Sequence, residues 1–111
     1  RKKTITQIII DLLNSERWCE NAPYEINNGD CEAFAMDIID ELGGEDAPRL
    51  FMDNTPPDAW GDSDAPEHCW VVYEGRFYDA ECPGGVKTRE ELPIFVKWAR
   101  SKAKTRSTTP D

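Results

Sequence analysis

The segment from His68 to Asp79 constrains the fold more than any other part of the chain, because it predicts a tight β-hairpin. Two runs rich in aromatic and β-branched residues flank the dipeptide Glu74-Gly75. A two-residue connection of this kind fixes the register of the two strands. The predicted cross-strand pairs are Tyr73 with Arg76, Val72 with Phe77, Trp70 with Asp79, and His68 with Glu81.

This register brings an imidazole and a carboxylate onto the same face of the hairpin. Alternate residues of a strand share a face, so His68 and Asp79 become diagonal neighbours, about 7 Å apart at the backbone. We therefore expect a hydrogen bond between them. Glu81, directly opposite His68, is the alternative partner, but the shorter side chain of Asp79 would hold the imidazole more rigidly. Trp70 lies on the same face, where it can pack in the core or shield the pair and contact a substrate.

A second informative segment is a helix that we expect to begin at Cys31. Asp30 is a suitable N-cap, and Gly43-Gly44 provides an end. Its apolar stripe consists of Cys31, Phe34, Ala35, Ile38, Ile39 and Leu42. A thiol at the first helical turn lies near free backbone N–H groups and the positive end of the helix dipole, which favour a thiolate. Cys31 can alternatively be a small buried residue of an amphipathic helix.

Cys31, His68 and Asp79 together are the parts of a nucleophile, a base and an orienting carboxylate. His68 is the only histidine of the chain, so no other histidine could act as the base. Asn28, just before the helix, could donate a hydrogen bond to an oxyanion, as could its neighbour Asn27. These residues form a candidate catalytic site, with Asn28 as a candidate substrate-binding residue.

The remaining elements follow from apolar spacing and turn residues. We expect an α+β fold in which the helix that carries Cys31 packs on a small antiparallel β-sheet. The expected segments are a helix over 4–18, a loop over 20–30, a strand over 49–52, a loop over 53–67, a turn over 82–85, and a last helix over 88–102 that Pro93 interrupts. Residues 1–103 would form one domain and residues 104–111 a disordered tail.

The loop over 53–67 is long, acidic and rich in proline, with a single aromatic residue, Trp60. Loops of this length in compact domains are often lids or binding loops, although a disordered connector is an equal alternative. Trp60 is therefore a further candidate substrate-binding residue, together with Asn28 and Trp70.

Charge and hydropathy exclude several function classes. The formal net charge of −9 would repel a phosphate backbone, so we expect no nucleic-acid partner. No apolar run approaches the roughly 18 residues of a membrane span. The basic start followed by the apolar residues 5–13 imitates a leader peptide, but Asp11 and the lack of a cleavage site favour a folded helix.

The four cysteines allow three disulfide pairings, but reduced thiols in a cytoplasm are the expectation for a chain with a real core and no leader. A zinc site of His68 and three cysteines is arithmetically conceivable. However, there is no Cys-x-x-Cys pair, and adjacent strand residues such as His68 and Cys69 point to opposite faces. Cys69 is then expected to be a small buried hydrophobe, and neither a metal nor a cofactor is expected.

Two motifs resemble one enzyme superfamily. Gly29-Asp30-Cys31-x-x-Phe34-Ala35 resembles the nucleophile helix of transglutaminase-like and papain-like thiol enzymes. His68-x-Trp70-Val71-x-x-x-Gly75-x-Phe77-x-Asp79 resembles the His-x-Trp segment, with its following aromatic residue and aspartate, of the transglutaminase-like branch. The resemblance covers residues 29–81. It implies a papain-like core with Cys31 as nucleophile, His68 as base and Asp79 as orienting residue.

These observations predict a small cytoplasmic thiol enzyme that cleaves or transfers an acyl group at an amide, isopeptide or thioester bond of a protein or peptide. Hydrolysis is the default, and transfer to an amine would follow if the site excludes water. We expect a monomer that acts without a cofactor, in a host cytoplasm if a phage encodes it. The alternative is a catalytically inactive protein-binding module of a phage or mobile-element type, which would use the acidic loop around Trp60.

Overall fold

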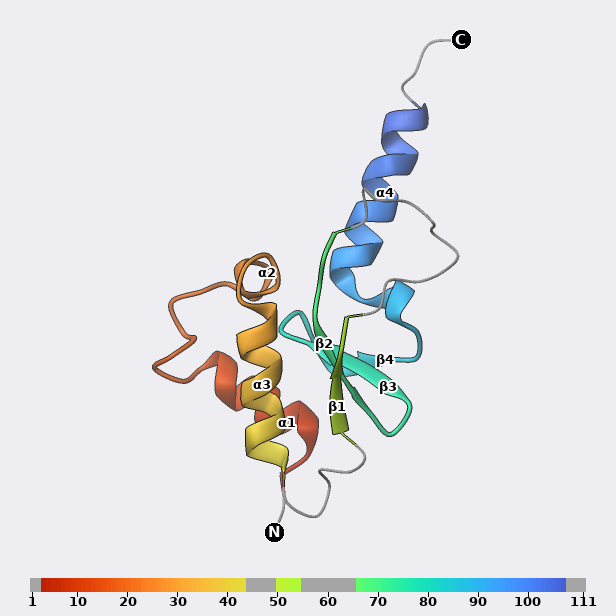
Figure 1. Cartoon of the computed structure of the whole chain (residues 1–111). Coiled ribbons are helices and arrows are strands. Elements are labelled where there is room, and N and C mark those ends of the chain that lie inside the picture. The colour runs from red at the N-terminus through yellow and green to blue at the C-terminus, as the bar shows by residue number, and fades with distance from the viewer. Residues whose placement is uncertain (1–2, 44–49, 55–65, 108–111) are drawn as a thin grey trace.

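The computed structural model describes residues 3–43, 50–54 and 66–107, with side chains as far as Ser101, and has an α+β architecture (Figure 1). The elements in chain order are α1 (Ile5–Leu13), α2 (Pro23–Asn27), α3 (Cys31–Leu42), β1 (Leu50–Asp53), β2 (Trp70–Tyr73), β3 (Arg76–Asp79), β4 (Cys82–Val86), the 3-10 helix η3 (Arg89–Glu91) and α4 (Pro93–Ser107). The four strands form one antiparallel sheet in the order β1-β2-β3-β4. The predicted fold class and small antiparallel sheet are confirmed.

The β2–β3 hairpin has the predicted turn and register. Val72 pairs with Phe77, and Tyr73 pairs with Arg76. The two turn residues have φ angles of 49° for Glu74 and 78° for Gly75, as a type I′ connection requires. The strand β3 ends at Asp79, so the predicted extension of the ladder to a pair of His68 and Glu81 is wrong.

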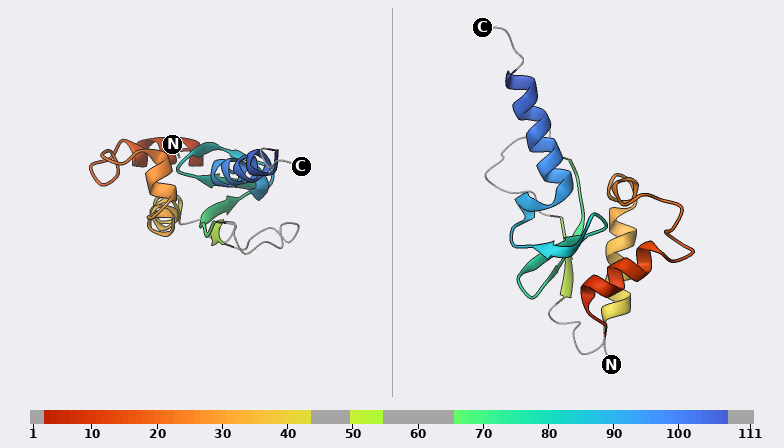
Figure 2. Two further views of the ribbon diagram at one scale, coloured as in Figure 1. Left: turned by 90° about the horizontal axis from the view of Figure 1, so that it is seen from above. Right: turned by 180° about the vertical axis from the view of Figure 1, so that it is seen from behind.

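Helices cover both faces of the sheet (Figure 2). Leu50, Val71 and Tyr78 belong to one cluster of buried residues, which also contains the apolar residues of α1 and α3. Trp70 lies on the other face, in a cluster with Leu92, which follows η3, and with Ile94 and Phe95 from the start of α4. This alternation of Trp70 and Val71 between the two clusters is what a strand buried on both faces requires.

The helix α3 begins at Cys31, as predicted, but its start differs in one detail. Asp30 occupies the N-cap position, yet its side chain makes no capping hydrogen bond. By contrast, the Thr4 hydroxyl caps α1 by accepting a hydrogen bond of 3.1 Å from the backbone N–H of Gln7. The helix α1 ends at Leu13, earlier than predicted, and turns follow as far as the buried Trp18.

Two predicted irregular segments are regular in the structure. Residues 23–27, expected as loop, form the short helix α2, which Pro23 opens and the Glu25 carboxylate stabilises by accepting the N–H of Ala22 at 2.7 Å. Residues 82–86, expected to begin with a turn, form the strand β4. There Gly85 has a φ of 78°, and a Cβ atom on it would lie 2.6 Å from the ring of Tyr78.

The C-terminal helix also departs from the prediction. Pro93 begins α4 rather than interrupting it, and α4 extends through Ser107, into the segment predicted as a tail. Most of the acidic loop, including Trp60, lies outside the described residues, as do residues 108–111. None of the helices in the described part of the chain is long and apolar enough to cross a membrane.

Candidate active site

Cys31, His68 and Asp79 come from three different segments of the chain that meet at one end of the sheet. Cys31 is the first residue of α3, and Asp79 is the last residue of β3. His68 precedes β2 by two residues and therefore lies at the same end, because β2 and β3 are antiparallel. The antiparallel hairpin thus brings His68 and Asp79 together, and the packing of α3 on the sheet adds the thiol.

The imidazole of His68 is bound to Asp79 as expected. His68 Nε2 and Asp79 Oδ2 are 2.8 Å apart, and the two side chains are 0% and 2% exposed. The other oxygen, Asp79 Oδ1, accepts a hydrogen bond of 2.9 Å from the backbone N–H of Glu81. With both oxygens occupied, the Asp79 carboxylate has a fixed orientation toward the ring of His68.

Two aromatic side chains pack against the imidazole. The ring of His68 lies 5.8 Å from that of Phe95 in an edge-to-face arrangement and 5.9 Å from that of Trp70. Trp70 is 1% exposed, so it packs in the core and offers no surface for the expected contact with a substrate. These rings keep water from the His68–Asp79 pair and hold the imidazole in one orientation.

The second nitrogen of the ring is left for Cys31. His68 Nδ1 is buried and has no partner at full hydrogen-bond distance among the described residues. The thiol of Cys31 is nevertheless near enough to interact with the imidazole. That interaction is the main cause that lowers the pKa of Cys31, against the opposing effect of burial. Distances somewhat beyond the normal range are common in thiol sites without a substrate.

The pKa of His68 shifts in the opposite direction. Burial by itself would lower it, but the hydrogen bond with Asp79 and the interaction with Cys31 together outweigh burial and raise the pKa of His68 from 6.5 to about 9. A thiol whose pKa falls beside an imidazole whose pKa rises favours a thiolate–imidazolium pair. A nucleophilic cysteine needs this state, because the thiolate is the reactive form.

The structure corrects the prediction for Cys69. The residues before Trp70 are not part of β2, so the strand alternation that would separate His68 from Cys69 does not apply. The thiol of Cys69 instead interacts with Cys31, and its backbone N–H contributes to lowering the pKa of Cys31. The pKa of Cys69 itself is raised to about 11, first by burial and then by the charge of Cys31. Cys69 is therefore a protonated thiol that can donate a hydrogen bond to Cys31.

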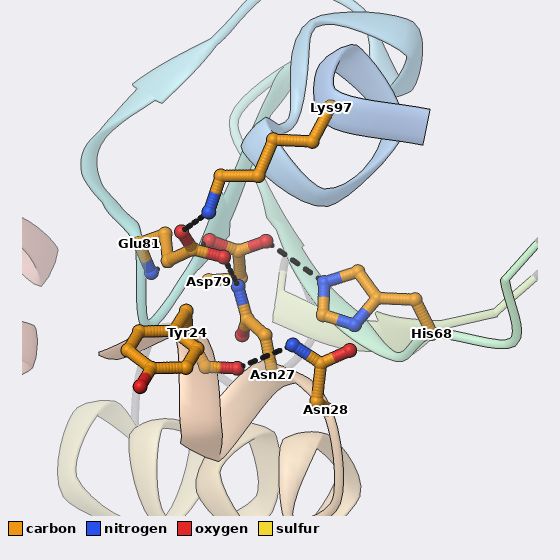
Figure 3. A network of polar contacts seen from close by, with 7 residues as sticks. All are labelled: Tyr24, Asn27, Asn28, His68, Asp79, Glu81 and Lys97. Carbon is orange, nitrogen blue, oxygen red and sulfur yellow. Dashed lines mark hydrogen bonds and ion pairs between the residues drawn. The ribbon is translucent and has the colours of Figure 1, made fainter. Parts of the chain in front are cut away.

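A polar network surrounds the pair and ties α2 and α4 to the turn after β3 (Figure 3). The Glu81 carboxylate accepts a hydrogen bond of 2.9 Å from Asn27 Nδ2 and forms an ion pair with Lys97. Glu81 thus serves two residues other than His68, so the expected alternative partner of the imidazole is not used. Neither Glu81 nor Lys97 was assigned this contact from the sequence, because they are 16 residues apart and belong to different elements.

The two asparagines before α3 have different surroundings. Asn28 is exposed, and its Nδ2 donates to the carbonyl oxygen of Tyr24 at 2.7 Å. Asn27 is 2% exposed and lines the same recess as Cys31 and Cys69. Asn27 is therefore better placed near the thiol than the predicted Asn28, and its position at the end of α2 explains why the sequence alone did not separate them.

A metal centre is not formed by the part of the chain that the structure describes: no group of three or more histidine, cysteine, aspartate or glutamate residues there could hold an ion. No protein-family model, curated protein or solved structure matches this chain. Its function must therefore be argued from the chemistry of the residues that the fold brings together.

Proposed function

We propose that this protein is a thiol enzyme in which Cys31 is the nucleophile, His68 the general base and acid, and Asp79 the residue that orients the imidazole. One observation carries the proposal. A buried histidine is bound to a carboxylate through Nε2, its Nδ1 has no hydrogen-bond partner in the described part of the chain, and the imidazole lowers the pKa of the neighbouring Cys31 thiol. A histidine that served only to stabilise the core would have no need of a neighbouring reactive thiol.

The reaction follows from this arrangement. The Cys31 thiolate adds to the carbonyl carbon of the substrate, and the new C–S bond leaves a negative charge on the carbonyl oxygen. Backbone N–H groups at the start of α3 can stabilise that oxyanion. The imidazolium then gives its Nδ1 proton to the leaving group as the bond to that group breaks, which yields a thioacyl enzyme and a neutral imidazole.

Resolution of the thioacyl enzyme uses the same imidazole. His68 Nδ1 removes a proton from an incoming water as the water oxygen attacks, and the Cys31 thiolate leaves. An amine in place of water would give acyl transfer. Asp79 stabilises the imidazolium and keeps Nε2 protonated in both steps. No cofactor is needed, and the free state of all four cysteines favours a reducing compartment such as a cytoplasm.

The substrate class is an amide, isopeptide or thioester carbonyl, most simply of a protein or peptide. The placement of a thiol at a helix start against an antiparallel hairpin that bears histidine and aspartate supports a papain-like or transglutaminase-like relationship. Hydrolysis is the expected outcome where water reaches the thioacyl group. The loop around Trp60, on which an inactive binding module would depend, lies outside the described residues.

The direct test is to trap the thioacyl enzyme. A peptide S-phenyl thioester should add its acyl group to Cys31, as detected by intact mass and peptide mapping after rapid acid quench, with a burst of one thiophenol per chain before slower turnover. His68→Ala should slow this acylation strongly, whereas Cys19→Ala, at an exposed cysteine, should not. Acylation spread over several cysteines, or acylation of Cys31 that does not depend on His68, would contradict the proposal and favour the binding module.

A further inference from the structure

A pocket of about 310 Å³ lies beside the proposed reaction centre. Its volume is at the lower end of the range for small-molecule and side-chain sites. The residues that line it are Asn28, Pro66, Glu81, Ile94, Lys97, Trp98 and Ser101. We call it the α4 pocket, because four of these seven residues belong to α4.

The walls of the α4 pocket continue the segments that carry the reactive groups. Asn28 precedes Cys31 by three residues, Pro66 precedes His68 by two, and Glu81 follows Asp79 by two. The opposite wall is one face of α4, since positions 94, 97, 98 and 101 have helical spacing. Figure 3 shows Asn28, Glu81 and Lys97 around the His68–Asp79 pair. When the carbonyl group of a peptide substrate lies at Cys31, the side chain of a neighbouring substrate residue can therefore reach this pocket.

The chemistry of the walls favours a neutral occupant. Ile94, Trp98 and Pro66 provide apolar surface, and each is buried or half-buried. The two charged residues that line the pocket neutralise each other, because Glu81 forms an ion pair with Lys97. The second carboxylate oxygen of Glu81 is occupied by Asn27. A charged side chain entering the pocket would lose hydration without gaining an unpaired counter-charge among these residues.

We infer that the α4 pocket binds an apolar side chain, branched aliphatic or aromatic, of a peptide substrate, within two residues of the carbonyl that Cys31 attacks. This inference rests on the proposed function and adds to it a preference for one class of substrate side chain. The strong negative charge of the whole chain would by itself favour basic substrates. The paired charges of the pocket select instead for a neutral, apolar residue next to the reacting bond.

The test uses N-acetyl-dipeptide S-phenyl thioesters in which either residue is Leu, Phe, Gly, Lys or Glu and the other is Gly. Acylation forms a C–S bond to Cys31 and expels thiophenolate, which is followed by absorbance at fixed pH. Thioesters with Leu or Phe in one of the two positions should acylate Cys31 about tenfold or more faster than the thioester with Gly there. Discrimination of this size is typical of an apolar subsite. Lys and Glu should be no faster than Gly. Iodoacetamide, too small to fill the pocket, measures the intrinsic reactivity of Cys31.

Two variants connect any preference to the pocket. Ser101→Trp fills it from an exposed position and should abolish the preference for Leu or Phe while leaving the iodoacetamide rate unchanged. Arg100→Trp adds the same ring to an exposed residue of α4 that does not line the pocket, and should keep the preference. Trp98→Ala, which removes part of the apolar wall, should lower the preference and provides a second variant if Ser101→Trp does not fold.

The outcomes separate the two proposals. Equal rates for Leu, Phe and Gly, or a preference for Lys or Glu, would overturn the assignment of the α4 pocket and leave the thiol enzyme intact. A preference for Leu or Phe that survives both Ser101→Trp and Trp98→Ala would also overturn it. Failure of every thioester to acylate Cys31, together with unselective iodoacetamide labelling, would instead overturn the proposed function.

Discussion

His68 Nε2 and Asp79 Oδ2 are 2.8 Å apart, and both side chains are almost completely buried. Because Asp79 occupies Nε2, Nδ1 is the ring nitrogen that remains available, and it has no hydrogen-bond partner among the described residues. A buried carboxylate next to a histidine also stabilises the imidazolium, which is why the pKa of His68 rises despite burial. The geometry of this pair is the basis of the predictions that follow.

Asp79→Asn should reduce the rate of thioester turnover severely. The amide cannot stabilise an imidazolium, and it favours the wrong tautomer of the ring. In a Ser-His-Asp triad the equivalent change costs roughly ten-thousandfold in kcat. The control is Glu81→Gln, since Glu81 contacts Asn27 and Lys97 rather than His68, and we expect a loss of less than about tenfold. The steady-state rate of thiophenol release measures both effects. A greater loss of rate for Glu81→Gln than for Asp79→Asn would show that Asp79 is not the orienting residue.

The stability of the fold should depend on pH through His68. A group whose pKa is raised from 6.5 to about 9 on folding contributes stability that is complete below pH 6.5 and is lost as pH rises through 9. The lowered pKa of Cys31 acts in the opposite direction, so the measurement belongs in a Cys31→Ser background. There the free energy of unfolding in urea should fall between pH 6.5 and 9.

A second substitution identifies the source of that pH dependence. Adding Asp79→Asn to the Cys31→Ser background removes the main partner that raises the pKa of His68 in that background. The fall in unfolding free energy between pH 6.5 and 9 should then become much smaller. An unchanged fall would show that groups other than the His68–Asp79 pair govern stability in this range.

Gly85 and Gly84 form a matched pair for testing the packing of β4. A Cβ atom at Gly85 would lie 2.6 Å from the Tyr78 ring, and its φ of 78° disfavours other residues, whereas a Cβ atom at Gly84 meets nothing within 4 Å. Gly85→Ala should therefore lower the free energy of unfolding by roughly 1–3 kcal/mol. Gly84→Ala should change it by less than about 0.5 kcal/mol. Urea denaturation checks both, and equal effects would show that β4 does not pack against Tyr78 in this way.

Local patterns were sufficient for the parts of the site that lie within one element. The Glu74-Gly75 turn predicts the register of β2 and β3, and the apolar stripe from Cys31 to Leu42 predicts α3, because turn geometry and helical periodicity act over a few residues. The expectation that Asp79 lies beside His68 followed from that register and is confirmed.

The rest depends on contacts between distant segments. The strand β4 was missed because Pro83 and two glycines favour a turn locally, while pairing with β3 makes the segment a strand. Phe95 reaches the imidazole from α4, and Cys69 lies beside Cys31 because β2 begins only at Trp70, two residues after the predicted start at His68. No spacing within the sequence encodes these tertiary contacts.

The reactivity of the four cysteines against pH tests the central claim most directly. The pKa of Cys31 is lowered, mainly by His68, whereas burial raises the pKa values of Cys69 and Cys82. The exposed Cys19 serves as the reference, because its alkylation rate is that of an accessible thiol without an imidazole partner.

Limiting iodoacetamide at pH 6.5, read by peptide mass spectrometry, should label Cys31 before Cys19 and leave Cys69 and Cys82 almost unmodified. His68→Ala should remove the advantage of Cys31 over Cys19. Labelling of Cys31 that is no faster than that of Cys19, or that is unchanged by His68→Ala, would contradict the account and return Cys31 to the role of a half-buried helix residue.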